Sequence, residues 1–205
     1  MIQQTQALLS DLDATLAKAS NVRRSDMLRR MTDLLLSSAP SYSPEAVAIF
    51  DAVMQRLTQD VEPKALAELS GRLAATDAAP AELIMRLSQS DDIAVSGPVL
   101  EKSNLLGDNT LVGVASTKGQ GHLLAIAGRV SINDVVTDVL VDRGDPAVRC
   151  KVTANVGAKI SENGFARLVT EARRDKRLAA LVNQRSDIPA ELLPFIKMSV
   201  GGAAG

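Results

Sequence analysis

The spacing of apolar residues predicts helices from the start of the chain. Leu9, Leu12 and Leu16 lie on one face of a helix with about 3.6 residues per turn. A second apolar stripe over residues 27–35 follows Ser25, which has the hydroxyl typical of an N-cap. These two stripes predict the first two helices.

Two proline-containing turns predict the next two helices. Ser43-Pro44-Glu45 combines a capping hydroxyl, a proline suited to the first helical position and an acid near the positive end of the helix dipole. Glu62-Pro63 precedes another apolar stripe. Because the connections are short, we expect four antiparallel helices, forming an N-terminal bundle or cap over residues 1–76.

Beyond residue 77 the sequence repeats itself. The tetrapeptide Pro80-Ala81-Glu82-Leu83 returns as Pro189-Ala190-Glu191-Leu192, and each copy is expected to open a short amphipathic helix. Between the copies lie four positions that we call the anchors, spaced 26, 26 and 30 residues apart: Ser103, Arg129, Asn155 and Arg185. A unit of this length accommodates two short helices and their turns, but not a strand–helix–strand crossover.

Each anchor stands in a similar apolar setting. Three residues before the anchors are Leu100, Ile126, Val152 and Val182. Three residues after them, where we expect the next helix to open, are Leu106, Ile132, Ala158 and Ile188. Helix starts are further indicated by the capping residues Asp91-Asp92, Asp108, Asn133, Asp145-Pro146 and Ser161-Glu162. Residues 134–141 resemble a strand, but their apolar positions follow a helical pattern and predict a helix.

The predicted fold is therefore all-α. HEAT-like helix pairs over residues 77–197 are expected to stack into a right-handed α-solenoid, because each pair exposes an apolar face that a neighbour can cover. The N-terminal bundle precedes the repeats, the Pro189 helix closes them, and residues 198–205 are expected to form a flexible tail.

Three segments resemble a known family. They are residues 91–100, residues 119–129, which contain His122-Leu123-Leu124-Ala125-Ile126, and residues 136–145. The chain resembles, over about residues 30–197, an uncharacterised family of unknown function (DUF2336) found mainly in alphaproteobacteria. The resemblance implies a helical, HEAT-like repeat protein and implies no reaction or catalytic residue.

Composition narrows the possible functions. Aromatic residues make up 2% of the chain, which argues against a β-sandwich and against binding by base stacking. One cysteine and one histidine cannot form a disulfide framework or a structural zinc site. The cysteine usage suits the reducing cytoplasm, and the sequence has neither a signal peptide pattern nor an apolar run long enough to span a membrane.

The net charge of −1 hides a basic segment. Residues 142–185 hold ten Lys or Arg against five Asp or Glu. The candidate interaction surface within this segment consists of Arg167, Arg173, Arg174, Lys176, Arg177 and Arg185. Such a cluster can bind a phosphate backbone or an acidic protein, or can be a solvated helix end whose cations complement the dipole.

Other candidate residues have structural explanations. His122 has no acid or nucleophile at local spacing, so we interpret it as a packing or capping residue. Arg149 and Lys151 flank Cys150 and would lower its pKa, although a half-buried helical cysteine is the simpler interpretation. Asp91-Asp92 and Asp142 with Asp145 suggest helix caps more than a metal or acid–base site. We therefore assign no catalytic, cofactor or metal residue and expect no cofactor.

The leading hypothesis is a non-enzymatic cytoplasmic scaffold that binds a protein partner through the faces of its repeats. The alternative is nucleic-acid binding through residues 142–185. A helical-repeat enzyme of the glycosylase or lyase type is a third reading, for which the sequence offers no catalytic constellation.

Overall fold

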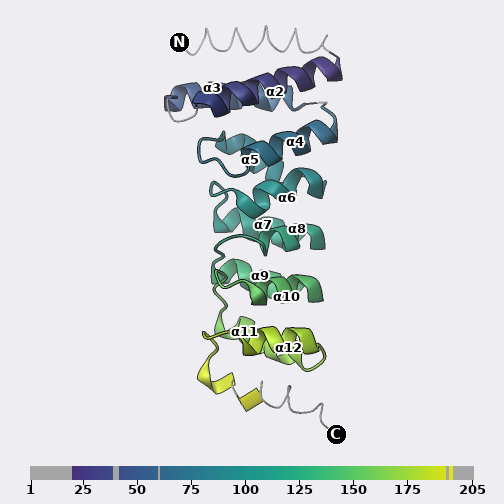
Figure 1. Cartoon of the computed structure of the whole chain (residues 1–205), viewed down its shortest axis with the longest axis vertical. Helices are drawn as coiled ribbons and strands as arrows, with labels where there is room; N and C mark the ends of the chain where they lie inside the picture. Colours follow the sequence, from purple (N-terminus) through teal and green to yellow (C-terminus); the bar gives the residue numbers. More distant parts are fainter. Residues whose placement is uncertain (1–19, 39–41, 60, 193, 196–205) are drawn as a thin grey trace. The chain divides into compact units, whose positions relative to one another are not determined.

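The described part of the chain is entirely helical. The computed structural model describes residues 20–38, 42–59, 61–192 and 194–195. In these ranges eleven α-helices follow one another with no extended strand, which confirms the predicted all-α class (Figure 1). The helix predicted around Leu9 to Leu16 and the tail predicted at 198–205 lie outside the described residues.

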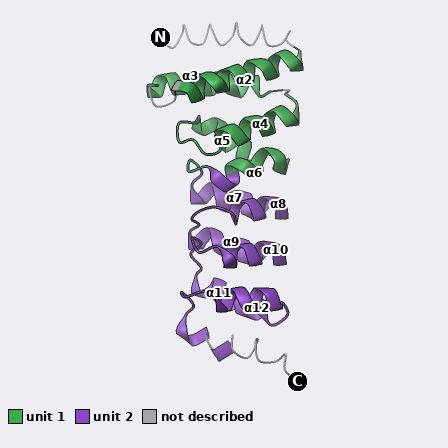
Figure 2. Cartoon of the chain, in the orientation of Figure 1, with its two compact units in different colours: residues 1–99, 103–105 green, residues 100–102, 106–205 purple. Residues whose placement is uncertain are grey.

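The helices divide into two compact units (Figure 2). Unit 1 comprises residues 1–99 and 103–105, and unit 2 comprises residues 100–102 and 106–205. Helix α6 (Ile93–Lys102) contributes to both. The expected division into a bundle at 1–76 and repeats at 77–197 stays a prediction.

In its described residues, unit 1 contains four helices besides the larger part of α6. Their bounds are α2 Asn21–Ser38, α3 Pro44–Leu57, α4 Pro63–Leu73 and α5 Ala81–Ser88. Helix α2 packs on α3 and α4, and α5 packs on both α3 and α4. Leu35, Met54 and Leu83 are among the fully buried side chains between them. Burial of this apolar area is the main contribution to the stability of such a bundle.

Two predicted helix starts in unit 1 have different outcomes. The Ser43 hydroxyl accepts a hydrogen bond from the Ala46 amide at 3.3 Å, so its prediction as the N-cap of α3 is confirmed. Ser25 was predicted as the N-cap of α2, and this is wrong. Helix α2 already begins at Asn21, where the Ser20 hydroxyl accepts from the Arg23 amide at 3.4 Å. Any of several serines can cap, and the earlier one does so here.

The repeated tetrapeptide takes two conformations. At its first copy, helix α5 begins immediately after Pro80. The Asp51 carboxylate of α3 accepts hydrogen bonds from the Glu82 and Leu83 amides, each at 3.1 Å, and so replaces the side-chain cap that proline cannot supply. At the second copy residues Ala190–Leu192 form a 3₁₀ turn, and the rest of the amphipathic helix predicted there falls largely outside the described residues.

In its described residues, unit 2 contains three helix pairs besides the end of α6. The bounds are α7 Asp108–Thr117 with α8 Gln120–Ile126, α9 Asp134–Arg143 with α10 Pro146–Ala154, and α11 Glu162–Ala172 with α12 Lys176–Asn183. Helix α9 contacts α7 and α11, whereas α10 contacts α8 and α12. The first helices of the pairs thus form one layer and the second helices another. Helix α9 also confirms that residues 134–141 are helical.

The linkers between pairs run beside one another. Ile132 and Ala158, each three residues after an anchor, form an isolated parallel bridge. The Ile132 amide donates to the Gly157 carbonyl at 3.1 Å, and the Lys159 amide donates to the Ile132 carbonyl at 2.9 Å. Ile132 and Ala158 are buried, but they lie in the linkers and do not open the next helix as predicted. Helix α9 begins only at Asp134 and helix α11 only at Glu162, so each helix starts two or more residues after the buried linker side chain.

Several predicted caps are confirmed. The carboxylates of Asp92 and Asp145 and the hydroxyl of Ser161 each accept from an amide in the first turn of the following helix. Asn133 precedes α9 but does not cap it through its side chain. The side-chain Nδ2 of Asn133 instead donates to the Asp108 carboxylate of α7 at 2.6 Å. Asn133 therefore links the starts of two first-layer helices.

Candidate interaction surface

The anchors have a shared structural role in unit 2. Arg129, Asn155 and Arg185 follow α8, α10 and α12, and each side chain reaches back to the preceding repeat. The buried Arg129 guanidinium donates to the Leu100 carbonyl at 2.7 Å, near the end of α6. Because the last carbonyls of a helix have no partner within the helix, this bond satisfies a buried acceptor that would otherwise lack a hydrogen bond. Burial also lowers the pKa of Arg129.

Asn155 makes the equivalent connection with an amide. Its Nδ2 donates to the Ala127 carbonyl at 3.1 Å and to the Arg129 carbonyl at 2.7 Å. Its Oδ1 accepts from the Gly157 amide at 2.9 Å within its own linker. Both ends of the amide are therefore used, one toward the preceding repeat and one toward the turn that follows α10.

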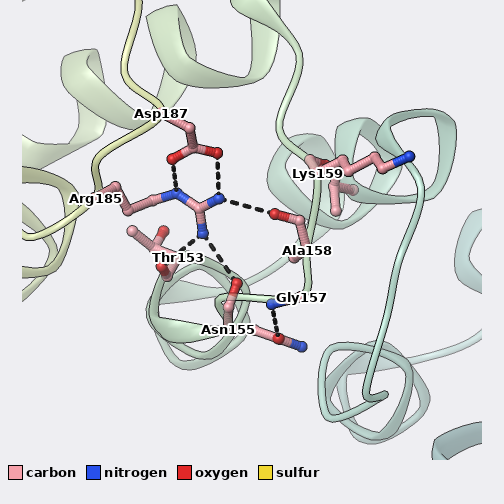
Figure 3. A network of polar contacts seen from close by, with 8 residues as sticks. Thr153, Asn155, Gly157, Ala158, Lys159, Arg185 and Asp187 are labelled. Carbon is pink, nitrogen blue, oxygen red and sulfur yellow. Dashed lines mark hydrogen bonds and ion pairs between the residues drawn. The ribbon is translucent and has the colours of Figure 1, made fainter.

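Arg185 makes the largest network, shown in Figure 3. Its side chain is only 8% exposed and donates to the carbonyls of Thr153, Asn155 and Ala158 at 2.8–3.1 Å. The other edge of the guanidinium pairs with both carboxylate oxygens of Asp187 at 2.6 and 2.8 Å. These hydrogen bonds hold the pKa of Asp187 below its usual range.

The six predicted surface cations lie in three different settings. Arg185 is held in the network just described, with its guanidinium also 5.7 Å from the centre of the Phe165 ring. Arg167, in α11, is exposed and forms an ion pair with Asp142 of α9. Arg173 and Arg174 follow α11, and Lys176 and Arg177 open α12. The fold thus brings together only the four cations of the α11–α12 turn.

This turn keeps a positive charge in spite of its one acid. The Asp175 carboxylate accepts from the amides of Arg177 and Leu178, at 2.9 and 3.1 Å, as the N-cap of α12. Within the described ranges, no carboxylate forms an ion pair with the exposed side chain of Arg173, Arg174 or Lys176. These cations remain available to a partner or to solvent.

Two hollows lie on the first-helix layer, and we call them the odd-helix hollows. Each has a volume of about 370–430 Å³ and includes Asp142 and Arg167 among its lining residues. Arg149 in one of them pairs with Glu171 at 2.9 Å. Arg167 of α11 and Arg149 of α10, which line these hollows, are therefore both paired with acids of the protein itself.

A larger hollow of about 640 Å³ lies along the second helices, and we call it the even-helix groove. Its lining residues are Leu124, Ala127, Gly128, Arg129, Val130, Ala147, Cys150, Lys151, Ala154, Asn155, Arg177 and Leu181. Most of these lining residues are apolar, and three are cations: Arg129, Lys151 and Arg177. In the described part of the chain no Asp or Glu lines the groove. Lys151 faces Glu101 at 3.7 Å, beside the groove.

Exposed valines follow two of the anchors. Val130 is 93% exposed and Val156 is 99% exposed, at equivalent positions of successive repeats. Val130 lines the even-helix groove, and Val156 lines an adjoining hollow of about 370 Å³ that shares Ala154 and Leu181 with it. Sequence reasoning missed this surface, although an apolar residue directly after two aligned anchors is a signal that could have indicated it.

The remaining candidate residues have structural environments. His122 is buried in the first turn of α8. Cys150 is 5% exposed, and burial raises the pKa of its thiol, with a further increase from Asp175. Burial outweighs the lowering from the nearby Arg177, so the structure favours the interpretation of Cys150 as a helical packing residue. Asp92 and Asp145 act as caps, and the described residues hold no group of three His, Cys, Asp or Glu placed to bind a metal.

Over the ranges that the structure describes, every helix is too short or too polar to cross a bilayer.

Comparison with protein-family profiles gives a match. The profile of a family described as an uncharacterised protein conserved in bacteria (DUF2336) matches residues 95–198, just over half of the chain. No curated protein and no solved structure matches. The matched residues include helices α7 to α12 and the three anchors that reach back to a preceding repeat. The chain belongs to the DUF2336 family of bacterial proteins.

Proposed function

We propose that this protein is a non-enzymatic helical-repeat scaffold that binds a protein partner. In this proposal the helix pairs of unit 2 form a right-handed α-solenoid of HEAT-like units. The two layers of helices and the equivalent anchors support it, since each pair contacts the next through the same elements. The free cysteine suits a reducing cytoplasm, where we expect the scaffold to act.

The observation that carries the proposal is the even-helix groove with its exposed valines. Val130 and Val156 repeat at one position of successive units and leave apolar surface open beside a hollow of about 640 Å³. Apolar surface that recurs at fixed separations is a feature by which repeat proteins bind extended partners. Binding would be dominated by a few central contacts.

The proposal is tested by affinity capture with the full chain as bait. The bait is a purified, tagged protein, the extract is treated with nuclease, and the same capture is repeated at low and moderate salt. We expect a small set of proteins to be retained in nearly stoichiometric amount and identified by mass spectrometry. Recovery of nothing beyond the proteins retained by an untagged control would contradict the scaffold.

Nucleic-acid binding is the second candidate, because of the four cations at the α11–α12 turn. Asp175, the only acid among them, is already used as a helix cap. The test is the fluorescence anisotropy of a labelled DNA duplex between about 50 and 200 mM salt, a range over which phosphate contacts weaken steeply. Binding that falls with salt and is lost in an Arg173→Glu, Arg174→Glu double variant would support this candidate over the protein partner.

A further inference from the structure

We infer that the even-helix groove binds an acidic, apolar segment of a protein partner. This inference rests on the proposed scaffold function and names the surface and the chemistry of its occupant. It follows from three properties of the groove: its apolar walls, its one sign of charge and its continuity with the neighbouring hollow.

The walls favour apolar side chains. Leu124, Val130 and Leu181 line the groove together with three alanines. Val130 is almost fully exposed, so covering it removes apolar surface from water without displacing any contact of the fold. A volume of about 640 Å³ accommodates several side chains of a ligand.

The charge of the groove favours carboxylates. Lys151 and Arg177 are its partly exposed cations, and in the described residues the lining includes no acid. Lys151 already faces Glu101, whereas Arg177 forms no ion pair with any described carboxylate. In the odd-helix hollows, by contrast, Arg167 and Arg149 are paired with Asp142 and Glu171. A carboxylate of a partner is the group that would complete the pairing at Arg177.

The extent of the surface favours a peptide over a small molecule. Ala154 and Leu181 line both the groove and the hollow that includes Val156, so the two form one continuous surface along α10 and α12. An extended or helical segment can place apolar side chains in both, with an acid between them for Arg177. A nucleic acid would gain little from the valines, and no aromatic side chain among the lining residues offers a stacking surface.

The experiment uses a random library of 12-residue peptides displayed on phage and selected on the full-length protein. The expected outcome is enrichment of sequences that combine Asp or Glu with Leu, Ile, Val or Phe. The most enriched peptide is then synthesised with a fluorescent label, and its dissociation constant is measured by anisotropy. Enrichment of basic or purely polar sequences, or of no sequence family, would overturn the inference.

Matched variants locate the binding surface. Arg177→Glu is expected to weaken binding of the labelled peptide by about tenfold or more, because it opposes carboxylates. Arg174→Glu makes the same change of charge three residues away, outside the groove, and is expected to weaken binding less than about threefold. An acid at position 177 lies in the first turn of α12, where the helix dipole favours it, so folding is not at risk. Equal losses in the two variants would contradict the groove.

A second pair tests the apolar contact without changing charge. Val130→Ser is expected to raise the dissociation constant of the labelled peptide about three- to tenfold. Val135→Ser changes an exposed valine of α9 outside the groove and is expected to leave the dissociation constant of the peptide unchanged. A labelled single-stranded DNA measured in parallel should bind weakly and be indifferent to Val130→Ser. If the DNA bound more tightly than the peptide and Arg177→Glu abolished DNA binding, a nucleic acid would replace the peptide as the proposed occupant of the groove.

The outcomes separate this inference from the proposed function. If partners are captured by the full chain and are retained by both Arg177→Glu and Val130→Ser, the scaffold stands and the groove is not its binding surface. If no partner is captured and no peptide is selected, both are wrong. Thermal unfolding of each variant, followed by circular dichroism, shows that a loss of binding is not a loss of fold.

Discussion

The side-chain amide of Asn155 donates to the backbone carbonyl of Arg129, the residue that holds the equivalent position one repeat earlier, at 2.7 Å. Arg185 repeats the relationship with the carbonyl of Asn155 at 3.0 Å. The anchors of unit 2 are therefore bonded to one another in series. The pairs α7–α8 and α9–α10 are each bonded to a polar side chain of the pair that follows.

Replacing the Asn155 amide by a carboxylate should destabilise the protein more than removing it. Asn155→Ala deletes two donated hydrogen bonds and is expected to lower the free energy of unfolding by about 1–3 kcal/mol. Asn155→Asp places a carboxylate acceptor against the carbonyls of Ala127 and Arg129 and should lower the free energy of unfolding further than Asn155→Ala does. Urea unfolding measures both, and an aspartate variant as stable as the alanine variant would contradict the role of the donor.

Arg185 should be worth more to stability than any exposed arginine of the basic segment. Arg185→Ala leaves three backbone carbonyls with one partner fewer and is expected to lower the free energy of unfolding by about 2–4 kcal/mol. Arg185→Lys should recover only part of this loss, since an ammonium cannot reproduce the planar fork. Arg174→Ala is the control and should change stability by less than about 0.5 kcal/mol. Chemical denaturation of the three variants gives the comparison.

Gly157 should not tolerate a side chain. A Cβ at this position would meet the Val130 carbonyl oxygen of the neighbouring linker far inside contact distance. Gly157→Ala is therefore expected to destabilise the protein by about 2 kcal/mol or more, because the two linkers must separate. Gly113 lies within α7 with open space around it, so Gly113→Ala should stabilise by about 0.5–1 kcal/mol. Opposite shifts of the two melting temperatures would bear this out, and a neutral Gly157→Ala would refute it.

Acid should weaken the contact between Asp187 and Arg185. The pKa of Asp187 is lowered in the folded protein, chiefly by the hydrogen bonds from Arg185. A lowered carboxyl pKa means that its stabilisation is complete above the unfolded value of about 3.9 and is lost as the pH falls through the folded value. The stability difference between the wild type and Asp187→Asn should thus be constant near neutral pH and shrink below about pH 4. Urea midpoints of both proteins at a series of pH values test this, and a difference independent of pH would exclude the linkage.

The buried positions of the repeats could be predicted from the sequence because they follow a local pattern. Leu100, Ile126, Val152 and Val182, each three residues before an anchor, are all fully buried. The function of the anchors could not be predicted in the same way. Their acceptors lie 26–32 residues earlier in the chain, and no local pattern indicates which carbonyls a linker will approach.

The charge pattern shows the same limit at the candidate site. The sequence groups Arg185 with Arg173 and Arg174, but only the fold distinguishes a guanidinium enclosed by carbonyls from one in water. Likewise, Pro80-Ala81-Glu82-Leu83 opens a helix whose first amides are satisfied by Asp51, whereas the second copy of the tetrapeptide gives a 3₁₀ turn. Identical residues differ in structure when a distant side chain supplies the missing hydrogen bonds.

The anchors of unit 2 differ in chemistry, and this difference limits whether helix pairs can be added or removed. A guanidinium reaches one carbonyl at the end of α6, a shorter amide reaches two after α8, and a second guanidinium reaches three around the end of α10. Duplicating or deleting one pair would set an anchor of the wrong length and hydrogen-bonding capacity against a helix end. Arrays of near-identical consensus repeats accept such edits because every junction is the same. In this protein the three junctions differ, so we expect the order of the pairs to be specified and the pairs not to be interchangeable as modules.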